Sequence, residues 1–419
     1  MTQNHISVNL TSYFKVFEES LTKPQFSHFK SWVQGIIHGK THGSDIAKHF
    51  SSKHETSLTR FHSRSKWEQE EINQIRINHA INVASQAMIE EQSAEDLIAN
   101  INHSEVDDSW CYIIDDTTNE KYGKQVPGGG YHWSNSAKRS VWGQKLVTSH
   151  LRIGNSDFPL FTNLYDKNSG VSKIEIAMQH IESFELPQDE KQGVLLVDSW
   201  FSSKDIIRKA MERELNIITM IKRNRLIKPH GLDDQWIPVN KISGSLRKSG
   251  LRRVKVENTK FRYAQITGTI KNFNDEAFKI LLVQQYLPSK RKWSKFKYLL
   301  SGDATMEAWT ILRFYKKRWS IETFYKFAKE RLGFAKSRVM TEYSLSRFIL
   351  LLFCAYTYLS LAKNEMSTYH EGGGSYYHVQ DQVIGNCQTQ LINWVYIQTR
   401  EGRSLKEILL IMGLVKKSA

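Results

Sequence analysis

A row of polar side chains between residues 314 and 332 contains the residue types needed for acid–base or metal chemistry. The row consists of Tyr315, Arg318, Glu322 and Lys329. On a helix, which turns about 100° per residue, these positions fall within an arc of about 60°. Apolar residues on the adjacent flank predict that such a helix buries one side and holds its charges at the edge of a cleft. On spacing alone, the commoner meaning of such charges is a solvated helix face.

Further carboxylates follow two stretches that are predicted to be buried strands. Residues 110–114 end at Asp115 and Asp116, and residues 194–197 end at Asp198. In sheets flanked by helices, active sites collect where strands end. An aspartate after a strand is also a common turn or helix-capping residue, and this alternative stays open for each aspartate taken alone.

One of Asp115 and Asp116, together with Asp198 and Glu322, would supply oxygen ligands from three distant parts of the chain. Oxygen ligands suit Mg²⁺ or Mn²⁺, and the three cysteines lie too far apart in the sequence to suggest zinc or disulfides. Two such ions, roughly 3.5–4 Å apart, can activate a water or a 3′-hydroxyl and stabilise the departing oxygen of a phosphodiester. Neighbouring cations would neutralise the charge that develops in the transition state.

The elements that must position these residues belong to a chain of 419 residues, 40% hydrophobic and 24% charged, which indicates a large globular protein. Its formal net charge of +15 favours an anionic partner, either nucleic acid or a membrane surface. We see no export signal, and the longest apolar run, residues 348–362, is too short to span a bilayer. We therefore expect a cytoplasmic, nucleoid-associated protein that does not enter the membrane.

Hydrophobic periodicity divides the chain into regions of different secondary structure. The core is predicted to be α/β, with three strands, a helix, a strand, a helix and a strand in that order. The predicted regions are a helical N-terminal region (1–100), the α/β core (105–221 and 303–345), a basic and mainly β insertion (222–302) and a helical C-terminal region (346–419).

Two of these regions carry candidate DNA-binding residues. Residues 43–64 match a helix-turn-helix, in which Arg60 could meet phosphates or base edges, although an ordinary helical hairpin is the alternative. In the insertion, Arg252 and Arg253 belong to one of three basic clusters that could hold phosphates without reading sequence.

The spacing Tyr315-x2-Arg318-x3-Glu322-x6-Lys329 resembles the Tyr-Arg-Glu-Lys signature of the DDE transposases of bacterial insertion sequences, the insertion-sequence-four superfamily and its relatives. Residues 113–118 resemble the first aspartate segment of that family, and residues 194–201 resemble the second. Residues 57–61, followed by Trp67, are similar to the end-binding regions of some relatives. The resemblance covers about residues 40 to 340.

This resemblance implies a ribonuclease-H-like catalytic core interrupted by a β insertion. It also implies a protein that binds the terminal inverted repeats of its element, cleaves there with two Mg²⁺ ions, for which Mn²⁺ can substitute, and joins the 3′-hydroxyl ends to target DNA. The expected working form is a homodimer that holds two DNA ends in a synaptic complex. By the same resemblance Asp198 and Glu322 are metal ligands, and Tyr315, Arg318 and Lys329 contact DNA near the cleaved phosphate.

Several alternatives remain at this point. Asp115 and Asp116 both satisfy the family pattern Asp-x-Thr, and Asp115 is slightly favoured because it directly follows the apolar run, as Asp198 does. Trp200 could stack on a flipped base, although a tryptophan is more often a core residue. The rival functions are a transposase-derived DNA-binding protein without catalysis and a DDE nuclease that cuts but does not join.

Overall fold

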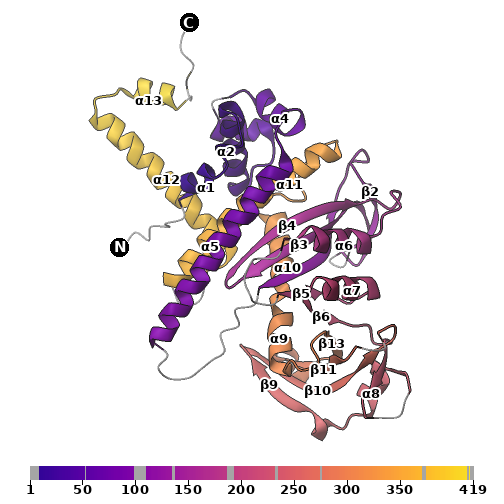
Figure 1. Ribbon diagram of the computed structural model, residues 1–419. Coiled ribbons are helices and arrows are strands. Elements are labelled where there is room, and N and C mark those ends of the chain that lie inside the picture. Colours follow the sequence, from indigo (N-terminus) through magenta and orange to yellow (C-terminus); the bar gives the residue numbers. More distant parts are fainter. Residues whose placement is uncertain are drawn as a thin grey trace.

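The computed structural model shows a mixed α/β protein in which helices from both ends of the chain pack together beside one large mixed sheet (Figure 1). This architecture is consistent with the expected ribonuclease-H-like core. The described residues are 9–51, 53–98, 110–134, 137–185, 193–231, 235–273, 276–369, 374–412 and 415. The first five residues of the predicted core, 105–109, and the basic pair at 416–417 lie outside this set.

The N-terminal region is helical, as predicted. Its helices are α1 (Leu10–Lys15), α2 (Lys23–Ile37), α3 (Gly43–Phe50), α4 (Glu55–Ser63) and α5 (Gln69–Ile98). Helices α3 and α4 coincide with the candidate helix-turn-helix. They pack together, and the apolar residues on their inner faces, Ile46 of α3 and Leu58 and Phe61 of α4, are buried in the same core cluster.

Thirteen strands of the described chain form one sheet. Along the sheet the order is β2-β3-β1-β5-β6-β13-β11-β10-β7-β8, with β4 beside β3, β9 beside β10 and β12 beside β11. The strands are β1 (Cys111–Glu120), β2 (Gly129–Ser134), β3 (Arg139–Ile153), β4 (Ser156–Tyr165), β5 (Val194–Val197), β6 (Asn216–Met220), β7 (Leu226–Pro229), β8 (Ile237–Pro238), β9 (Arg252–Val256), β10 (Thr259–Ile270), β11 (Phe278–Leu287), β12 (Lys292–Trp293) and β13 (Lys297–Ser301).

Strand β1 lies between β3 and β5 in the sheet. It runs antiparallel to β3 and parallel to β5, while β5 runs parallel to β6. The residues of β1 alternate between two apolar layers. Cys111 and Ile113 pack against the layer that includes the helices after residue 307, whereas Tyr112 and Ile114 pack against α6 (Lys173–Ser183) and α7 (Lys204–Glu212). The strand therefore has two faces with different helical neighbours.

The strand β1 is longer than the sequence indicated. We predicted that it ends at Asp115 and Asp116, but the ladder with β3 continues to Glu120. The polar residues 115–120 remain in the strand because backbone pairing with β3 holds them there, whatever their propensity. The glycine-rich loop that precedes β3 likewise enters the sheet, since Gly129 and Gly130 are the first residues of β2.

The basic residues after 221 extend the same sheet. Strand β13 pairs with β6 on one side and with β11 on the other, so the ladder passes from the centre of the sheet into β11, β10 and β9 without a break. Strands β9 to β11 lie in the region that was predicted to be mainly β. The short strands β7, β8, β12 and β13 are strands only because of their pairing partners.

The predicted helix of the Tyr-Arg-Glu-Lys row is two helices, α9 (Ala308–Lys317) and α10 (Trp319–Glu330). The break falls at Arg318, whose N–H donates to the Tyr315 carbonyl at 3.3 Å, one residue nearer than in a regular α-helix. Glu307 occupies the N-cap position of α9, while the side chain of Asp303 accepts a hydrogen bond from the Thr305 N–H at 2.7 Å in the preceding turn.

The C-terminal part consists of α11 (Glu342–Tyr369), α12 (Tyr376–Arg400) and α13 (Leu405–Ile411); the short elements of the insertion are α8 (Val239–Ser245), η1 (Lys248–Gly250) and η2 (Pro288–Lys290). Helix α11 is longer than the predicted apolar run. Among the described residues it is the one helix long and apolar enough to cross a membrane, but 94% of its apolar window is buried inside the protein. It packs against α2, α5 and β4, as the core helix of a globular protein does.

Candidate active site

Asp115 and Asp116 point to opposite faces of β1. Asp115 continues the alternation of Cys111 and Ile113, so it faces α10. The strand register places Ile114 beside Val197 of β5, which brings Asp198 alongside Asp115 at the edge where the β5 strand ends. Two of the predicted carboxylates are thus neighbours because two parallel strands carry them in matching register.

Arg318 joins Asp115 to Glu322. Its Nη1 atom lies 3.1 Å from Asp115 Oδ2, and its Nη2 atom donates to Glu322 Oε1. The break between α9 and α10 puts the guanidinium one turn before Glu322, over β1. The Tyr325 hydroxyl, on the next turn of α10, donates to the Asp115 backbone carbonyl at 3.0 Å and fixes the helix against the strand.

The charges at this bridge shift one another's pKa values. Burial raises the pKa of Asp115 to about 7; Arg318 limits the rise, while Asp198 and Asp116 add to it. Burial alone would lower the pKa of Arg318, but the negative charge of Asp115 and its other neighbours raises it instead. Burial also raises the pKa of Tyr315 to about 12, so the phenol stays neutral. The bridge is therefore a partly buried site whose carboxyl can still take up a proton near neutral pH.

Asp116 has a different environment. It accepts salt bridges from Lys145 on β3 at 2.6 Å and from Lys173 on α6 at 3.1 Å. All three side chains are at least 86% buried. The structure brings Asp115 to Arg318 and Glu322 and ties Asp116 to two lysines on the far face of the sheet, so the two candidates for the first carboxylate are not equivalent.

Lys329 lies two turns beyond Glu322 on the same flank of α10. Its Nζ atom donates to Thr117 Oγ1 at 2.6 Å and to the Thr118 carbonyl at 2.8 Å. Burial lowers the pKa of this ammonium to about 8, with a smaller contribution from Lys145. Along α10, Glu322 is therefore linked to Asp115 through Arg318, and Lys329 is linked directly to Thr117.

Asp198 begins a tight turn after β5. One of its oxygens, Oδ1, accepts hydrogen bonds from the backbone N–H groups of Trp200 and Phe201 at 2.8 and 3.2 Å. Trp200 is 45% exposed, so it is not the core residue that its type suggested, and the Lys173 Nζ atom lies 3.5 Å from the centre of its ring. Asp198 therefore combines the turn-forming role of an aspartate with a position beside Asp115.

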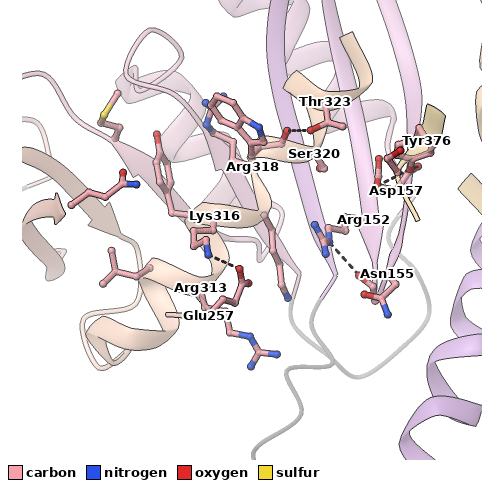
Figure 2. A pocket seen from close by; sticks show the side chains of 18 of the residues that line it. Arg152, Asn155, Asp157, Glu257, Arg313, Lys316, Arg318, Ser320, Thr323 and Tyr376 are labelled. Atoms are coloured by element: carbon pink, nitrogen blue, oxygen red, sulfur yellow. Dashed lines mark hydrogen bonds and ion pairs between the residues drawn. The ribbon is translucent and has the colours of Figure 1, made fainter. Parts of the chain in front are cut away.

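A cleft of about 1080 Å³ adjoins the bridge and is shown in Figure 2. Tyr315 and Arg318 form part of its wall; Asp115, Asp198 and Glu322 do not line it. Lys316 reaches Glu257 across the cleft, from α9 toward the turn after β9. Cations outnumber carboxylates on its surface, the cations being Arg152, Lys297, Arg313, Lys316, Lys317, Arg318 and Lys363 and the carboxylates Asp157 and Glu257.

The other predicted DNA contacts lie on separate elements. Arg252 and Arg253 are exposed on β9, the edge strand beside β10. Arg60 is exposed on α4. These three arginines were predicted to contact DNA away from the carboxylates. Their exposed positions leave them accessible to a long anionic partner.

Residues that sequence reasoning missed are Lys145, Lys173, Thr117 and Tyr325. Lys145 on β3, Lys173 on α6 and Tyr325 on α10 each contact an aspartate of β1. Thr117 belongs to β1 itself and accepts a hydrogen bond from Lys329. The alternation of β1 could have shown that one aspartate needs partners on the second face. Nothing in the local sequence around Lys145 or Lys173 identifies them as those partners.

In the part of the chain that the structure describes, no three His, Cys, Asp or Glu side chains gather closely enough to hold a metal ion. Arg318 lies between Asp115 and Glu322, where its positive charge neutralises the two carboxylates as a bound metal ion would. The donor set is nevertheless all oxygen, which suits Mg²⁺ or Mn²⁺. The chemistry of this donor set suits a metal, and Arg318 neutralises two of its members in this structure.

A mixed sheet with neighbouring aspartates on two parallel strands, faced by a glutamate on a later helix, defines the class of proteins with a DDE arrangement of carboxylates. Comparison with known protein families matches residues 107–358 to the family described as "Transposase DDE domain". Because this match covers more than half of the chain, the protein belongs to the DDE transposase domain family. Membership implies DNA transposase catalysis, a chemistry for which such domains generally use a divalent metal.

No curated protein matches the chain. Among solved structures, the chain is similar to one described as the cryo-EM structure of the piggyBac transposase synaptic complex with hairpin DNA. The sequence identity is 13% and the TM-score is 0.45, over 91% of this chain and 77% of that chain.

Proposed function

We propose that this protein is a DNA transposase that binds the terminal inverted repeats of its insertion sequence, cleaves there and joins the 3′-hydroxyl ends to target DNA. The observation that carries the proposal is the Arg318 bridge between Asp115 and Glu322 beside Asp198. Binding alone does not require three carboxylates at one site. Together with the Tyr-Arg-Glu-Lys spacing, they support an active enzyme of the insertion-sequence-four type with a ribonuclease-H-like core.

Asp115, Asp198 and Glu322 are the residues that would hold Mg²⁺, with two ions expected and Mn²⁺ as a substitute. A bound metal supplies a Lewis acid for the phosphate and lowers the pKa of the attacking hydroxyl. Arg318 would bind the DNA directly, because a phosphate can accept two parallel hydrogen bonds from its guanidinium. When Arg318 turns toward that phosphate, it leaves Asp115 and Glu322 free to bind cations.

The remaining residues of the row hold the DNA near the reacting phosphate. Lys329 is oriented by Thr117 and Thr118, so its ammonium approaches the site from a fixed direction. Tyr315 is neutral, so its hydroxyl would donate a hydrogen bond to the DNA. On the second face of β1, Asp116 acts as a structural brace between Lys145 and Lys173 and takes no part in metal binding.

We further propose that α3 and α4 bind the element ends, with Arg60 contacting DNA. The β9 to β11 region would hold the backbone through Arg252 and Arg253, and Trp200 would stack on an unpaired base. These roles follow the division of the chain into an end-binding region (1–100), a catalytic core (105–221 and 303–345), a basic insertion (222–302) and a C-terminal region (346–419). The protein would act in the cytoplasm, on the nucleoid, as a homodimer that joins two DNA ends.

The test is cleavage of a duplex that carries the inverted repeats flanking the gene. The purified chain with Mg²⁺ should nick or break this duplex at the element ends and join the product to a second DNA. Glu322→Gln should abolish both reactions, and Glu330→Gln, an exposed position at the end of the same helix, should not. Site-specific binding without strand breakage would indicate a DNA-binding protein instead, and cleavage without joining would indicate a nuclease.

A further inference from the structure

A second cavity lies at the edge of the sheet where the parallel strands β5 and β6 end. Its volume is about 380 Å³, and its wall comes from the turn after β5, the loop after β6 and the residues that follow β10. Met220 lines the basic cleft described above, whereas the next residue, Ile221, lines this second cavity. The two cavities therefore adjoin the end of β6 from different sides. We call the second cavity the Arg225 pocket.

Asp198 lies at the same edge of the sheet. The register of β5 and β6 places Val197 beside Thr219, whose hydroxyl donates to the Asp198 carbonyl at 3.3 Å. The turn that Asp198 begins supplies Trp200 and Ser202 to the wall of the pocket. The Arg225 pocket is therefore adjacent to one of the three carboxylates of the candidate site, although its described wall shares no residue with the cleft that Arg318 lines.

The wall of this pocket is positively charged. Lys222, Arg225 and Lys271 line it, and no aspartate or glutamate is among its described residues. The two lysines are exposed, whereas Arg225 is partly buried. Burial lowers the pKa of Arg225, which is the opposite of what a neighbouring carboxylate would do. In the part of the chain that the structure describes, the pocket thus offers positive charge without a counter-ion of its own.

The guanidinium of Arg225 also has unused hydrogen-bond donors. Its Nε and Nη2 atoms are buried, and neither has a hydrogen-bond partner among the described residues. These two atoms form one edge of the guanidinium, and this edge can hold two oxygens of one phosphate side by side. Ser202 Oγ, which belongs to the same wall, is likewise buried without a partner. Buried polar groups are rarely left unpaired, so these three atoms indicate a ligand that supplies acceptors.

The donors and the charges together select the chemistry of the ligand. Two parallel N–H groups and a hydroxyl match the several oxygens of a phosphate group. A single phosphodiester carries one negative charge, whereas the pocket presents three cations. A backbone of successive phosphates would use all three, with one phosphate at Arg225 and its neighbours near the exposed lysines. A nucleic-acid strand therefore fits the pocket better than a free phosphate ion does.

We propose that the Arg225 pocket binds a backbone phosphate of the DNA, separate from the reacting phosphate at Arg318. This inference rests on the proposed function, because it takes the DNA ends as the ligand. Arg225 already forms part of the wall, and turning its guanidinium into the pocket gives Nε and Nη2 two phosphate oxygens. Ser202 donates to the same group. A strand held there passes Asp198, so the pocket sets which phosphate of that strand faces the carboxylates.

The test neutralises one phosphate at a time and needs no catalysis. Duplexes that carry the inverted repeats flanking the gene, each with a single methylphosphonate in place of a phosphate, are titrated with the full chain in the absence of Mg²⁺. At one phosphate other than the cleaved one, the wild type should lose about tenfold in affinity. Arg225→Gln should bind the unmodified duplex about tenfold more weakly and lose nothing further at that phosphate, because the interaction is already absent.

Two other variants serve as a second probe and a control. Ser202→Ala should weaken binding of the unmodified duplex by about threefold and reduce the loss at the same phosphate. Arg400→Gln removes the same charge from an exposed position at the end of α12 and should keep both the affinity and the loss of the wild type. Circular dichroism and the melting temperature check that each variant is folded. Arg225→Gln should not lower the melting temperature, because Nε and Nη2 have no hydrogen bond to lose.

The possible results separate this inference from the proposed function. The same losses in the wild type and in Arg225→Gln at every methylphosphonate would overturn the inference, whether or not the protein cleaves DNA. Calorimetric binding of inorganic phosphate by the wild type and not by Arg225→Gln, with those losses unchanged, would assign the pocket to a free anion and would also overturn it. The expected pattern of losses without cleavage when Mg²⁺ is added would contradict the proposed catalysis and support the pocket. A wild type that does not bind the duplex would overturn both.

Discussion

The two faces of β1 place adjacent aspartates in opposite roles. On one face, Asp115 meets a single arginine that comes from the same segment as Glu322. On the other, Asp116 is held between lysines from β3 and α6. The chain offers both residues within one Asp-Asp-Thr-Thr sequence, and only the pleat of the strand separates them.

The difference lies in how each carboxylate is neutralised. Asp116 has two cations fixed by separate elements of the fold, so its charge is satisfied permanently. Asp115 shares one long, flexible side chain with Glu322, and that side chain has an alternative partner whenever a phosphate is nearby. A carboxylate with an exchangeable counter-ion can take up a metal, whereas one with two fixed counter-ions serves the structure.

The largest expected effect is a difference in DNA cleavage rate between variants of the two aspartates. Asp115→Asn should lower the single-turnover rate of DNA cleavage with Mg²⁺ by about a thousandfold, because it removes a charged ligand. Asp116→Asn should keep the rate within about tenfold of the wild type, since its effect passes through the fold alone. The comparison between the faces fails if the two losses are equal or reversed.

A second difference concerns stability. Asp116→Asn leaves Lys145 and Lys173 partly buried without a carboxylate, and should lower the free energy of unfolding by about 2–3 kcal/mol. Thermal unfolding of the metal-free protein checks this. Lys124→Gln, which alters an exposed lysine near β2, is a control that should leave the melting temperature unchanged. An unchanged melting temperature in Asp116→Asn would show that the lysine pair is no brace.

Arg318→Gln sharpens the account of the exchangeable counter-ion. Without the guanidinium, Asp115 and Glu322 repel each other, so the metal-free protein should lose about 1–2 kcal/mol of stability. Adding Mg²⁺ should raise its melting temperature more than it raises that of the wild type, because no internal cation competes. An equal rise in both proteins would mean that Arg318 does not occupy the metal's place.

The pH dependence of stability is the smallest effect. Burial raises the pKa of Asp115 from 3.8 to about 7, so the folded protein keeps a proton there that the unfolded chain releases near pH 4. Between pH 4 and 7 the folded state binds more protons than the unfolded state. This group therefore lowers the free energy of unfolding as pH rises, by about 1 kcal/mol per pH unit. Asp115→Asn should remove that slope relative to the wild type, and Asp116→Asn should keep it.

The sequence identifies the candidate carboxylates and the Tyr-Arg-Glu-Lys row on the later helix, because both are recognisable from short local spacings. The sequence also shows that Asp115 and Asp198 both follow short apolar runs, but it takes the structure to show that these runs pair in parallel. Which aspartate faces Glu322 does not follow, because it depends on which face of the sheet receives α10. That choice is made by packing over the whole core.

The helix break at Arg318 and the length of β1 also escaped prediction. Residues 314–332 have helical periodicity throughout, and nothing in their types marks the tight turn that aims the guanidinium at β1. The polar end of β1 is a strand only because β3 pairs with it. The short strand β13 likewise owes its state to β6 and β11. In each case the missing information is a contact between distant segments.

The most direct test of the central claim replaces each aspartate by cysteine and compares two metals. Replacing a carboxylate oxygen ligand by a thiolate sulfur disfavours Mg²⁺ binding. The softer Mn²⁺ tolerates the sulfur ligand better. Asp115→Cys should be inactive in DNA cleavage with Mg²⁺ and regain measurable cleavage with Mn²⁺, whereas Asp116→Cys should show the same relative activity with both metals. Rescue by Mn²⁺ at position 116 and not at 115 would contradict the account.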